Sequence, residues 1–255
     1  MKMFGKLKYA AVALMLAAAL LVPGRAQAIN FASERLNYQV VYHWGLIWKH
    51  AANATLSIKR SGTGYNAMLV GRTRSWADKV YPVRDTLKCA MNSDLTPRTY
   101  QKLTHEKNYY ARDVVNFSYG NGSTRGSCVR YRAHRAPQRV SLVARGRAYD
   151  MLSVFYMLRN LNFGSMATGK TYNTTIFSGK KKENLRIRYC GVQTIKMRNG
   201  TQHKAYHVTF TFTQDGGRKS SDGIDAYLSI DARRIPLMLV GKLPVGEVKV
   251  YSAGA

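Results

Sequence analysis

The stretch LNYQVVYHW, residues 36–44, decides the fold class of this chain of 255 residues. Apolar side chains take every second position of it, with mostly polar side chains between them, at Leu36, Tyr38, Val40, Tyr42 and Trp44. A period of two is typical of a β-strand that buries one of its faces. The stretch therefore predicts a strand with one apolar and one polar side.

The same alternation recurs along most of the remaining chain. A tight hairpin is predicted at 119–123, where Asn121-Gly122 can supply the positive φ angles of a two-residue turn. The pattern indicates a mainly β protein with large, curved antiparallel sheets, open or half-barrel-like. The further strands that we expect lie near 52–58, 65–69, 85–93, 98–107, 109–118, 125–132, 138–146, 171–178, 184–190, 192–199, 202–213, 224–231, 234–241 and 245–252.

One segment, residues 150–161, has helical spacing instead. Its apolar side chains recur at Met151, Val154, Phe155, Leu158 and Leu161. An aspartate at its first position is a good N-cap. We expect one central amphipathic helix that packs against the sheet. The mature chain, 29–255, is predicted to be a single β-rich domain, with two sub-sheets (29–149 and 162–255) flanking the helix as an open alternative.

The first 28 residues have the three parts of a secretory signal peptide. Three lysines (Lys2, Lys6 and Lys8) precede an apolar run over 9–22, and Ala26-Gln27-Ala28 supplies the small residues of a cleavage site. The apolar run is too short to span a bilayer comfortably. We therefore expect cleavage after Ala28 and export to the periplasm or cell envelope.

The charge of the chain is strongly positive, with 40 lysines and arginines against 13 acidic residues and a net charge of +27. Such a field attracts polyanions. In an exported protein these are anionic lipid head groups, lipopolysaccharide phosphates or acidic glycans; nucleic acid is a weaker expectation. A solvated basic surface without a dedicated partner is the alternative.

Two basic clusters are the candidate ligand-binding residues. Lys180, Lys181 and Lys182 fall in an expected hairpin tip, and Arg130 and Arg132 share one face of an expected strand. Arginine stripes of this kind suit phosphate contacts. Each cluster could equally be a solvated outer face.

The three cysteines of the mature chain are Cys89, Cys128 and Cys190. In an oxidising compartment one pair could bridge and leave an odd thiol, and a Cys89–Cys128 bond is one option. Buried free thiols are the slightly favoured interpretation. No CxxC pair is present, so redox catalysis and zinc-finger sites lack support.

Motifs that would carry enzymatic chemistry are weak. Residues 164–171 match the GxxxxGK[ST] pattern, but a helix is expected before them and a strand after them, the reverse of a phosphate-binding loop. His203 and His207 lie on an expected strand, where their spacing of about 13 Å prevents sharing of one ion. We predict no nucleotide, no metal and no cofactor. Asp78 and Asp85 leave a hydrolase with paired carboxylates as an alternative.

Several short motifs follow one another in an order that resembles a known family. They are Leu36-Asn37-Tyr38 with Trp44-Gly45, then 81–85, 149–153 with Leu158-Arg159, and 228–231 with 234–236 and Gly246. With these motifs the chain is similar to the exported bacterial proteins grouped as domain-of-unknown-function family 3108, over most of its mature length. The resemblance implies a β-rich periplasmic or outer-membrane-associated protein of Gram-negative bacteria, without established catalytic residues.

These observations favour a non-enzymatic binding protein of the periplasm or envelope, for an apolar, amphipathic or anionic envelope ligand. A hydrolase acting on envelope glycan or lipid is one alternative. A small outer-membrane barrel is another, although the basic charge, the central helix and an end at 252–255 without an aromatic residue argue against it.

Overall fold

The computed structural model describes residues 29, 31, 33–214, 223–242 and 246–254. The predicted signal peptide lies outside the described residues. Within them, fifteen strands form one sheet. The strands that precede the central helix are β1 (Ser33–Trp44), β2 (Ile47–Ser61), β3 (Gly64–Thr73), β4 (Arg84–Met91), β5 (Pro97–Glu106), β6 (Tyr109–Gly120), β7 (Ser123–Arg132), β8 (Arg135–Arg145) and β9 (Ala148–Tyr149).

The strands that follow the central helix complete the sheet. They are β10 (Thr171–Phe177), β11 (Lys182–Lys196), β12 (Gln202–Gln214), β13 (Ile224–Ser229), β14 (Pro236–Lys242) and β15 (Glu247–Ser252). Three helical segments accompany them: α2 (Ser75–Asp78), α3 (Ser153–Arg159) and a 3₁₀ turn, η1 (Phe163–Ser165). No helix among the described residues is both long and apolar enough to cross a bilayer.

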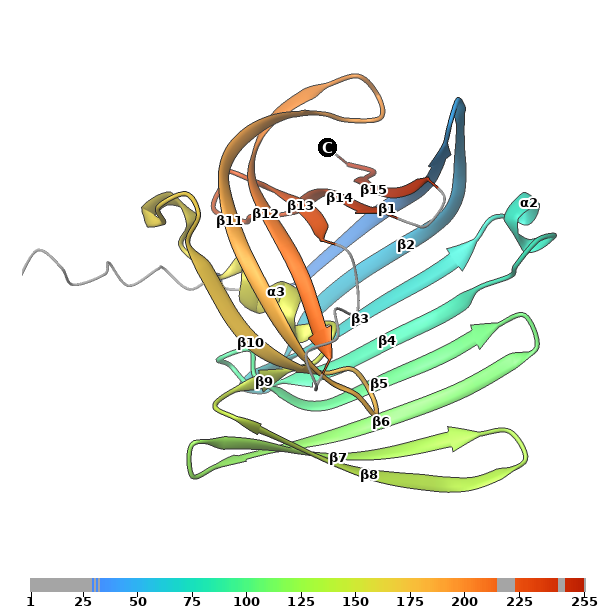
Figure 1. The fold of residues 1–255 in the computed structure, drawn as a ribbon, viewed down its shortest axis with the longest axis vertical. Coiled ribbons are helices and arrows are strands. Elements are labelled where there is room, and N and C mark those ends of the chain that lie inside the picture. The colour runs from blue at the N-terminus through green and yellow to red at the C-terminus, as the bar shows by residue number, and fades with distance from the viewer. Residues whose placement is uncertain (1–28, 30, 32, 215–222, 243–245, 255) are drawn as a thin grey trace, which may run out of the picture.

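The strand order makes the sheet a nearly closed barrel. It runs β8-β7-β6-β5-β4-β3-β2-β1-β15-β14-β13-β12-β11-β10-β9, so the first and last strands of the chain lie side by side. That β1–β15 pair is antiparallel and joins the strands on either side of α3 into one sheet. Figure 1 shows the two arms of the sheet curving around α3. The predicted mainly β fold with a large curved antiparallel sheet and a central helix is confirmed.

The two arms also touch across the barrel. The ring of Phe177, at the end of β10, stacks on that of Phe117 in β6, with 5.5 Å between their centroids. Both rings belong to or pack against one buried cluster, which also contains Tyr100, Val115 and residues of α3. Stacked aromatic pairs contribute beyond their buried area. The contact holds the two free edges of the sheet near each other.

The helix α3 is shorter and more buried than its sequence pattern predicts. It begins at Ser153 instead of Asp150, and all of its residues except Phe155 are buried. The carboxylate of Asp150 accepts hydrogen bonds from the amides of Leu152 and Ser153, while the Ser153 hydroxyl accepts one from the Asp150 amide. This reciprocal arrangement resembles a capping box and ties down a non-helical first turn. A helix covered by sheet on nearly all sides is a core element and not an amphipathic lid.

One expectation about the strands needs correction and another is confirmed. The segments predicted as separate strands at 184–190 and 192–199 are one strand, β11, with a bulge at Cys190 between paired Tyr189 and Gly191. Alternation shifts by one residue at a bulge, which explains the apparent break. The 119–123 hairpin is confirmed, with φ of 49° at Asn121 and 67° at Gly122.

Candidate functional site

An apolar cavity of about 190 Å³ lies inside the barrel beside α3. Strands from both ends of the chain and the helix itself contribute to its wall, so it exists because β1 pairs with β15. An apolar cavity of this kind has affinity for apolar groups. Its lining residues are Tyr38, Val40, Ala54, Leu56, Leu69, Leu152, Phe155, Pro236, Leu239 and Val250.

Tyr38 is the one lining residue with a polar side-chain atom. Its hydroxyl is buried and has no hydrogen-bond partner among the described residues. Burial raises the pKa of this hydroxyl far above its usual value, so it stays protonated and can donate a hydrogen bond. A buried hydroxyl without a partner costs about 1–3 kcal/mol. Only the ring of Tyr38 therefore contributes to the cavity wall, which presents no polar atom.

A buried ion pair, Arg159–Glu34, lies close to Tyr38. The guanidinium of Arg159, which is 1% exposed, donates to both carboxylate oxygens of Glu34, at 2.6 and 2.9 Å. The same guanidinium donates to the carbonyl of Arg233 and lies over the ring of Phe31. Arg159 thereby links α3 to β1 and to the β13–β14 turn. Its contacts are structural, because each donor named here is engaged within the chain.

The predicted basic residues of β7 converge on one carboxylate. Arg132 Nη1 lies 2.7 Å and Arg130 Nε 3.5 Å from Asp113 Oδ1, so the two arginines share a face as predicted. Arg130 also donates to Gln138 on β8. One carboxylate faces two guanidinium groups, which leaves an excess of positive charge. Asp113 itself was not singled out by the sequence.

The predicted lysines lie beside the same cluster. Lys180 and Lys181 are exposed in the β10–β11 turn, while Lys182 is half-buried and begins β11. The turn approaches Asp113 closely at Gly179, where a Cβ atom would lie 2.7 Å from Asp113 Oδ2. Only glycine fits there, with its φ of 98°. The fold thus brings together basic residues that lie some fifty positions apart in the sequence.

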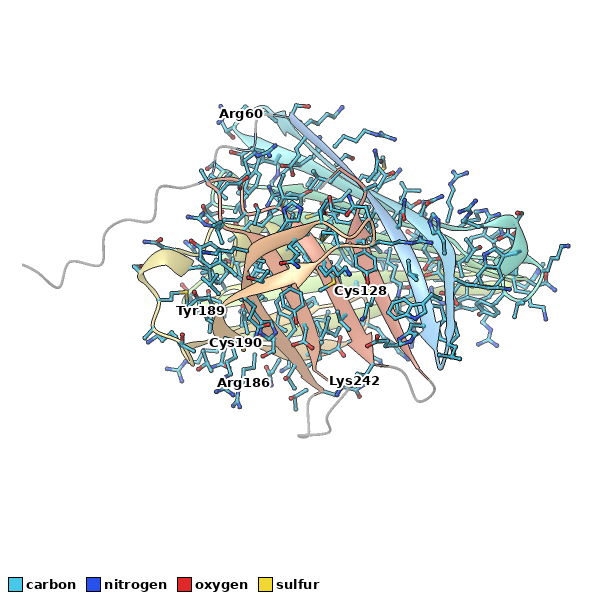
Figure 2. The ribbon with its side chains drawn as sticks, turned by 90° about the horizontal axis from the view of Figure 1, so that it is seen from above. Arg60, Cys128, Arg186, Tyr189, Cys190 and Lys242 are labelled. Atoms are coloured by element: carbon cyan, nitrogen blue, oxygen red, sulfur yellow. The ribbon has the colours of Figure 1, made fainter. Side chains whose placement is uncertain are left out.

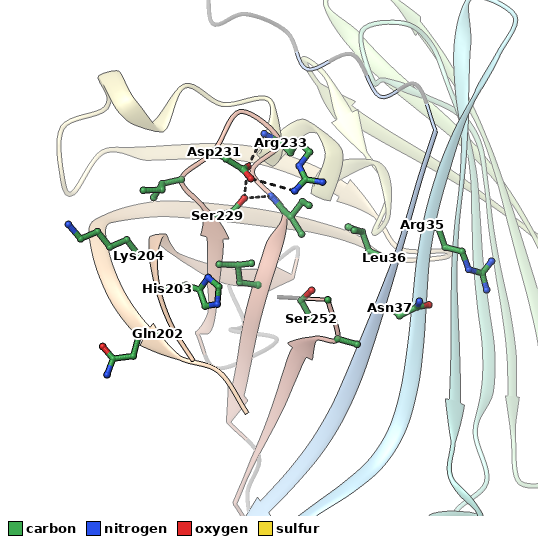
Figure 3. A pocket seen from close by; sticks show the side chains of 15 residues that line it. Arg35, Leu36, Asn37, Gln202, His203, Lys204, Ser229, Asp231, Arg233 and Ser252 are labelled. Carbon is green, nitrogen blue, oxygen red and sulfur yellow. Dashed lines mark hydrogen bonds and ion pairs between the residues drawn. The ribbon is translucent and has the colours of Figure 1, made fainter. Parts of the chain in front are cut away.

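A larger and more polar hollow, of about 690 Å³, lies between β1, β12 and the β13–β14 turn (Figure 3). Arg35, Lys204 and Arg233 are among its lining residues. Asp231 also lines it, and its carboxylate accepts from the Ser229 hydroxyl and the amide of Arg233, which fixes the turn. The hollow is basic, but its one acidic side chain is committed to local structure.

The two carboxylates considered for hydrolysis have separate surroundings. Asp78 lies on α2 and accepts hydrogen bonds from Arg84, which lower its pKa to about 2. Asp85 lies on β4 and accepts from the His105 amide, while burial raises its pKa. The hydrogen bonds of the described residues give the two carboxylates no common partner. The two carboxylates therefore have different hydrogen-bond partners.

The other motifs take up structural positions. Residues 164–171 run from η1 to the start of β10, so a helix precedes the loop and a strand follows it, as predicted. On β12, His207 bonds to Asp225 and His203 to the Thr201 hydroxyl. The described residues contain no cluster of three or more groups that could hold a metal ion.

The three cysteines are free thiols in the structure. Cys89 and Cys128 are buried as predicted, whereas Cys190 is half-buried at the β11 bulge, so the expectation of burial is wrong there. Cys89 donates to the buried carboxylate of Asp150 at 2.9 Å. Burial raises the pKa of both Cys89 and Asp150. Cys89 is therefore an unreactive thiol that serves packing.

Basic side chains such as Arg60 and Arg186 lie outside the barrel (Figure 2).

Comparison with known proteins places the chain in a family and a fold. A family model described as "Protein of unknown function (DUF3108)" matches residues 37–252. A crystal structure of a β-barrel-like protein of the domain of unknown function DUF1849, from Brucella abortus, is similar with a TM-score of 0.60 at 12% identity. The similarity covers 88% of this chain and 97% of that one. No curated protein matches.

Proposed function

The chain belongs to the DUF3108 family, and we propose that it is a non-enzymatic binding protein of the bacterial envelope that takes up an amphipathic ligand. The observation that carries the proposal is the apolar cavity beside α3. Export rests on the signal-peptide pattern of the first 28 residues. The DUF1849 structure supports the barrel-like architecture alone.

The size of the cavity limits the ligand. An engineered apolar cavity of about 150 Å³ accepts a molecule as small as benzene. Pockets that enclose whole drug-sized molecules start at about 300 Å³. The cavity of about 190 Å³ therefore matches one slim apolar group, such as the end of an acyl chain, and not a complete lipid. We infer that the rest of the ligand lies outside the cavity.

The cavity wall presents apolar atoms alone, so it favours the apolar end of a ligand. The arginines beside Asp113, outside the cavity, support a ligand whose other end is polar or anionic.

The basic cluster around Asp113 is our candidate for an anionic group of the ligand or of an envelope lipid. Arg130 and Arg132 face one carboxylate, and Lys180 and Lys181 follow Gly179 in the turn that approaches it, so the positive charge here exceeds the negative. A phosphate or carboxylate suits arginine donors because it accepts two parallel hydrogen bonds.

The experiment is incubation of the protein with an envelope lipid extract, followed by repurification and mass spectrometry of what remains bound. We expect one class of amphipathic molecule to be recovered above background in every preparation. Recovery of no lipid above background across several preparations would contradict the proposal.

A matched pair of variants ties the result to the cavity. Ala54→Phe places a ring into the cavity wall, whereas Thr55→Phe places the same ring at the next position of β2, whose side chain points to the other face of the sheet. Ala54→Phe should abolish recovery of the ligand and Thr55→Phe should retain it. Tyr38→Phe should leave recovery unchanged, because the ring of Tyr38 lines the cavity and its hydroxyl does not.

A further inference from the structure

Exposed apolar side chains gather on one side of the barrel. Four connections of the first half of the sheet, residues 42–50, 72–84, 105–112 and 130–139, form the tips on the right-hand side of Figure 1. We call these four segments the tip rim. Of the eleven exposed large hydrophobic side chains among the described residues, seven lie on it: Leu46, Trp48, Val80, Tyr81, Tyr109, Tyr110 and Tyr131.

The exposure on the tip rim is extreme for aliphatic residues. Leu46 is 100% and Val80 75% exposed, each at the end of a connection where no neighbour covers it. Near the opposite ends of the same strands, the exposed large hydrophobic side chains among the described residues are Tyr119, whose hydroxyl donates to the Pro97 carbonyl, and Val143. Single exposed apolar residues are ordinary, but a group of this size on one side marks an interaction surface.

The tip rim is also basic. Its four segments contain eleven lysines and arginines and two acidic residues. Both acids are engaged: Asp78 pairs with Arg84, and Glu106 accepts from the Tyr81 hydroxyl. Lys79, Lys107 and Arg135 are exposed and make no ion pair with another described residue. The surface therefore presents apolar and aromatic groups within a positive field.

Aromatic and basic residues are interleaved on the rim by direct contact. Lys49 lies 4.9 Å from the centre of the Trp76 ring, and Arg112 lies 4.2 Å from that of Tyr131. Tyrosine and tryptophan are the residues that favour the boundary between water and hydrocarbon. Lysine and arginine close to an anionic leaflet each contribute about 1 kcal/mol of attraction. A bilayer with anionic head groups is the partner that uses both properties at once.

We propose that the tip rim docks the protein onto the surface of an anionic bilayer. Leu46, Val80 and the tyrosines enter the head-group boundary, while the surrounding lysines and arginines contact lipid phosphates. The strands do not cross the bilayer in this arrangement. The proposal goes beyond the function proposed above. It shares Arg130 and Arg132 with the basic cluster around Asp113 but uses none of the residues that line the cavity, so uptake into the cavity and docking can fail separately.

The protein carries its own reporter for this test, because all three tryptophans of the chain, Trp44, Trp48 and Trp76, belong to the tip rim. The protein, in the form recovered from the cell, is titrated with vesicles of phosphatidylcholine alone and of phosphatidylcholine with phosphatidylglycerol. We expect a blue shift of the tryptophan emission and co-sedimentation with the anionic vesicles, both weakened by salt. Equal binding to both kinds of vesicle, or binding to neither, would overturn the proposal.

Paired variants assign the binding to the rim. Leu46→Glu with Val80→Glu should reduce the partition coefficient at least tenfold. The control, Val143→Glu with Val192→Glu, changes two other exposed valines in the same way, on β8 and β11, and should bind as the unaltered chain does. Any contribution of residues 1–28 is the same in both pairs. An equal loss of vesicle binding in both pairs of variants would contradict the proposal. It would also be contradicted if the unaltered protein formed a stable dimer without vesicles and the rim variant were monomeric.

Discussion

The region around α3 differs from the tip rim in how its charges are paired and how its apolar side chains are buried. Around α3, the buried charge of Arg159 is matched by Glu34, and the buried Asp150 receives hydrogen bonds from two amides. On the tip rim, Leu46 and Val80 face water and basic residues outnumber acids. The difference teaches that buried charges are matched around α3, while the surface that we propose for recognition lies on another part of the same sheet. Each prediction below compares the same kind of change in both regions.

The largest effect is expected for the buried guanidinium. Arg159→Ala removes both hydrogen bonds to Glu34 and leaves that carboxylate partly buried without its partner. Breaking such a pair costs about 3–5 kcal/mol of unfolding free energy. Arg135→Ala, on the tip rim, should change it by less than about 0.5 kcal/mol. Urea unfolding of both variants measures the contrast, and similar losses would contradict it.

A somewhat smaller effect is expected from truncation of an apolar side chain. Leu158 lies on α3 and is buried, so Leu158→Ala leaves a cavity and should cost about 2–5 kcal/mol. Leu46→Ala removes the same atoms from the exposed tip and should cost less than about 0.5 kcal/mol. Thermal unfolding of the two variants measures this difference in stability. A large loss for Leu46→Ala would show that the tip is packed.

The two regions should also respond to pH with opposite sign. Burial raises the pKa of Asp150 above 3.8 in the folded state. Its contribution to stability is therefore present below 3.8 and is lost as the pH rises through the folded pKa. Relative to Asp150→Asn, the urea midpoint of the unaltered protein should fall as the pH rises through this range. A difference that does not vary with pH would mean that burial does not perturb this carboxyl.

Asp78 on the tip rim gives the smallest effect, in the other direction. Its pKa is lowered to about 2 by hydrogen bonds from Arg84. A lowered pKa contributes stability above 3.8, and that contribution is lost as the pH falls through about 2. The difference in urea midpoint between the unaltered protein and Asp78→Asn should vanish over this acid range. A difference in urea midpoint that grows as the pH falls would contradict the direction that we assign to the pKa shift of Asp78.

The strands were predictable because one buried face imposes a period of two on the sequence. Residues 36–44 follow this rule until Val41, where the register of β1 against β2 shifts. The helix was found at its correct place, but its start was set too early, because Asp150 caps a turn that precedes α3. Periodicity reports which face is buried and not where the hydrogen bonds of a helix begin.

The site was predictable in part. Arg130 and Arg132 share a face because they are two apart on one strand, and this much follows from the sequence. Their approach to the β10–β11 turn depends on a contact across the barrel at Gly179, which local patterns do not encode. The apolar cavity was missed for the same reason, since its wall needs the pairing of β1 with β15. The exposed apolar side chains of the tip rim could have been suspected from the sequence, because Tyr109-Tyr110 lies beside an expected turn.

The division between a stable helix end and an interactive rim is tested most directly by hydrogen exchange, measured peptide by peptide with and without anionic vesicles. We predict that peptides covering α3 exchange slowly in both conditions, and that peptides covering the tip rim exchange fast in buffer and are protected by vesicles. Exchange of α3 as fast as that of the tips, or vesicle protection spread evenly over the barrel, would contradict the account.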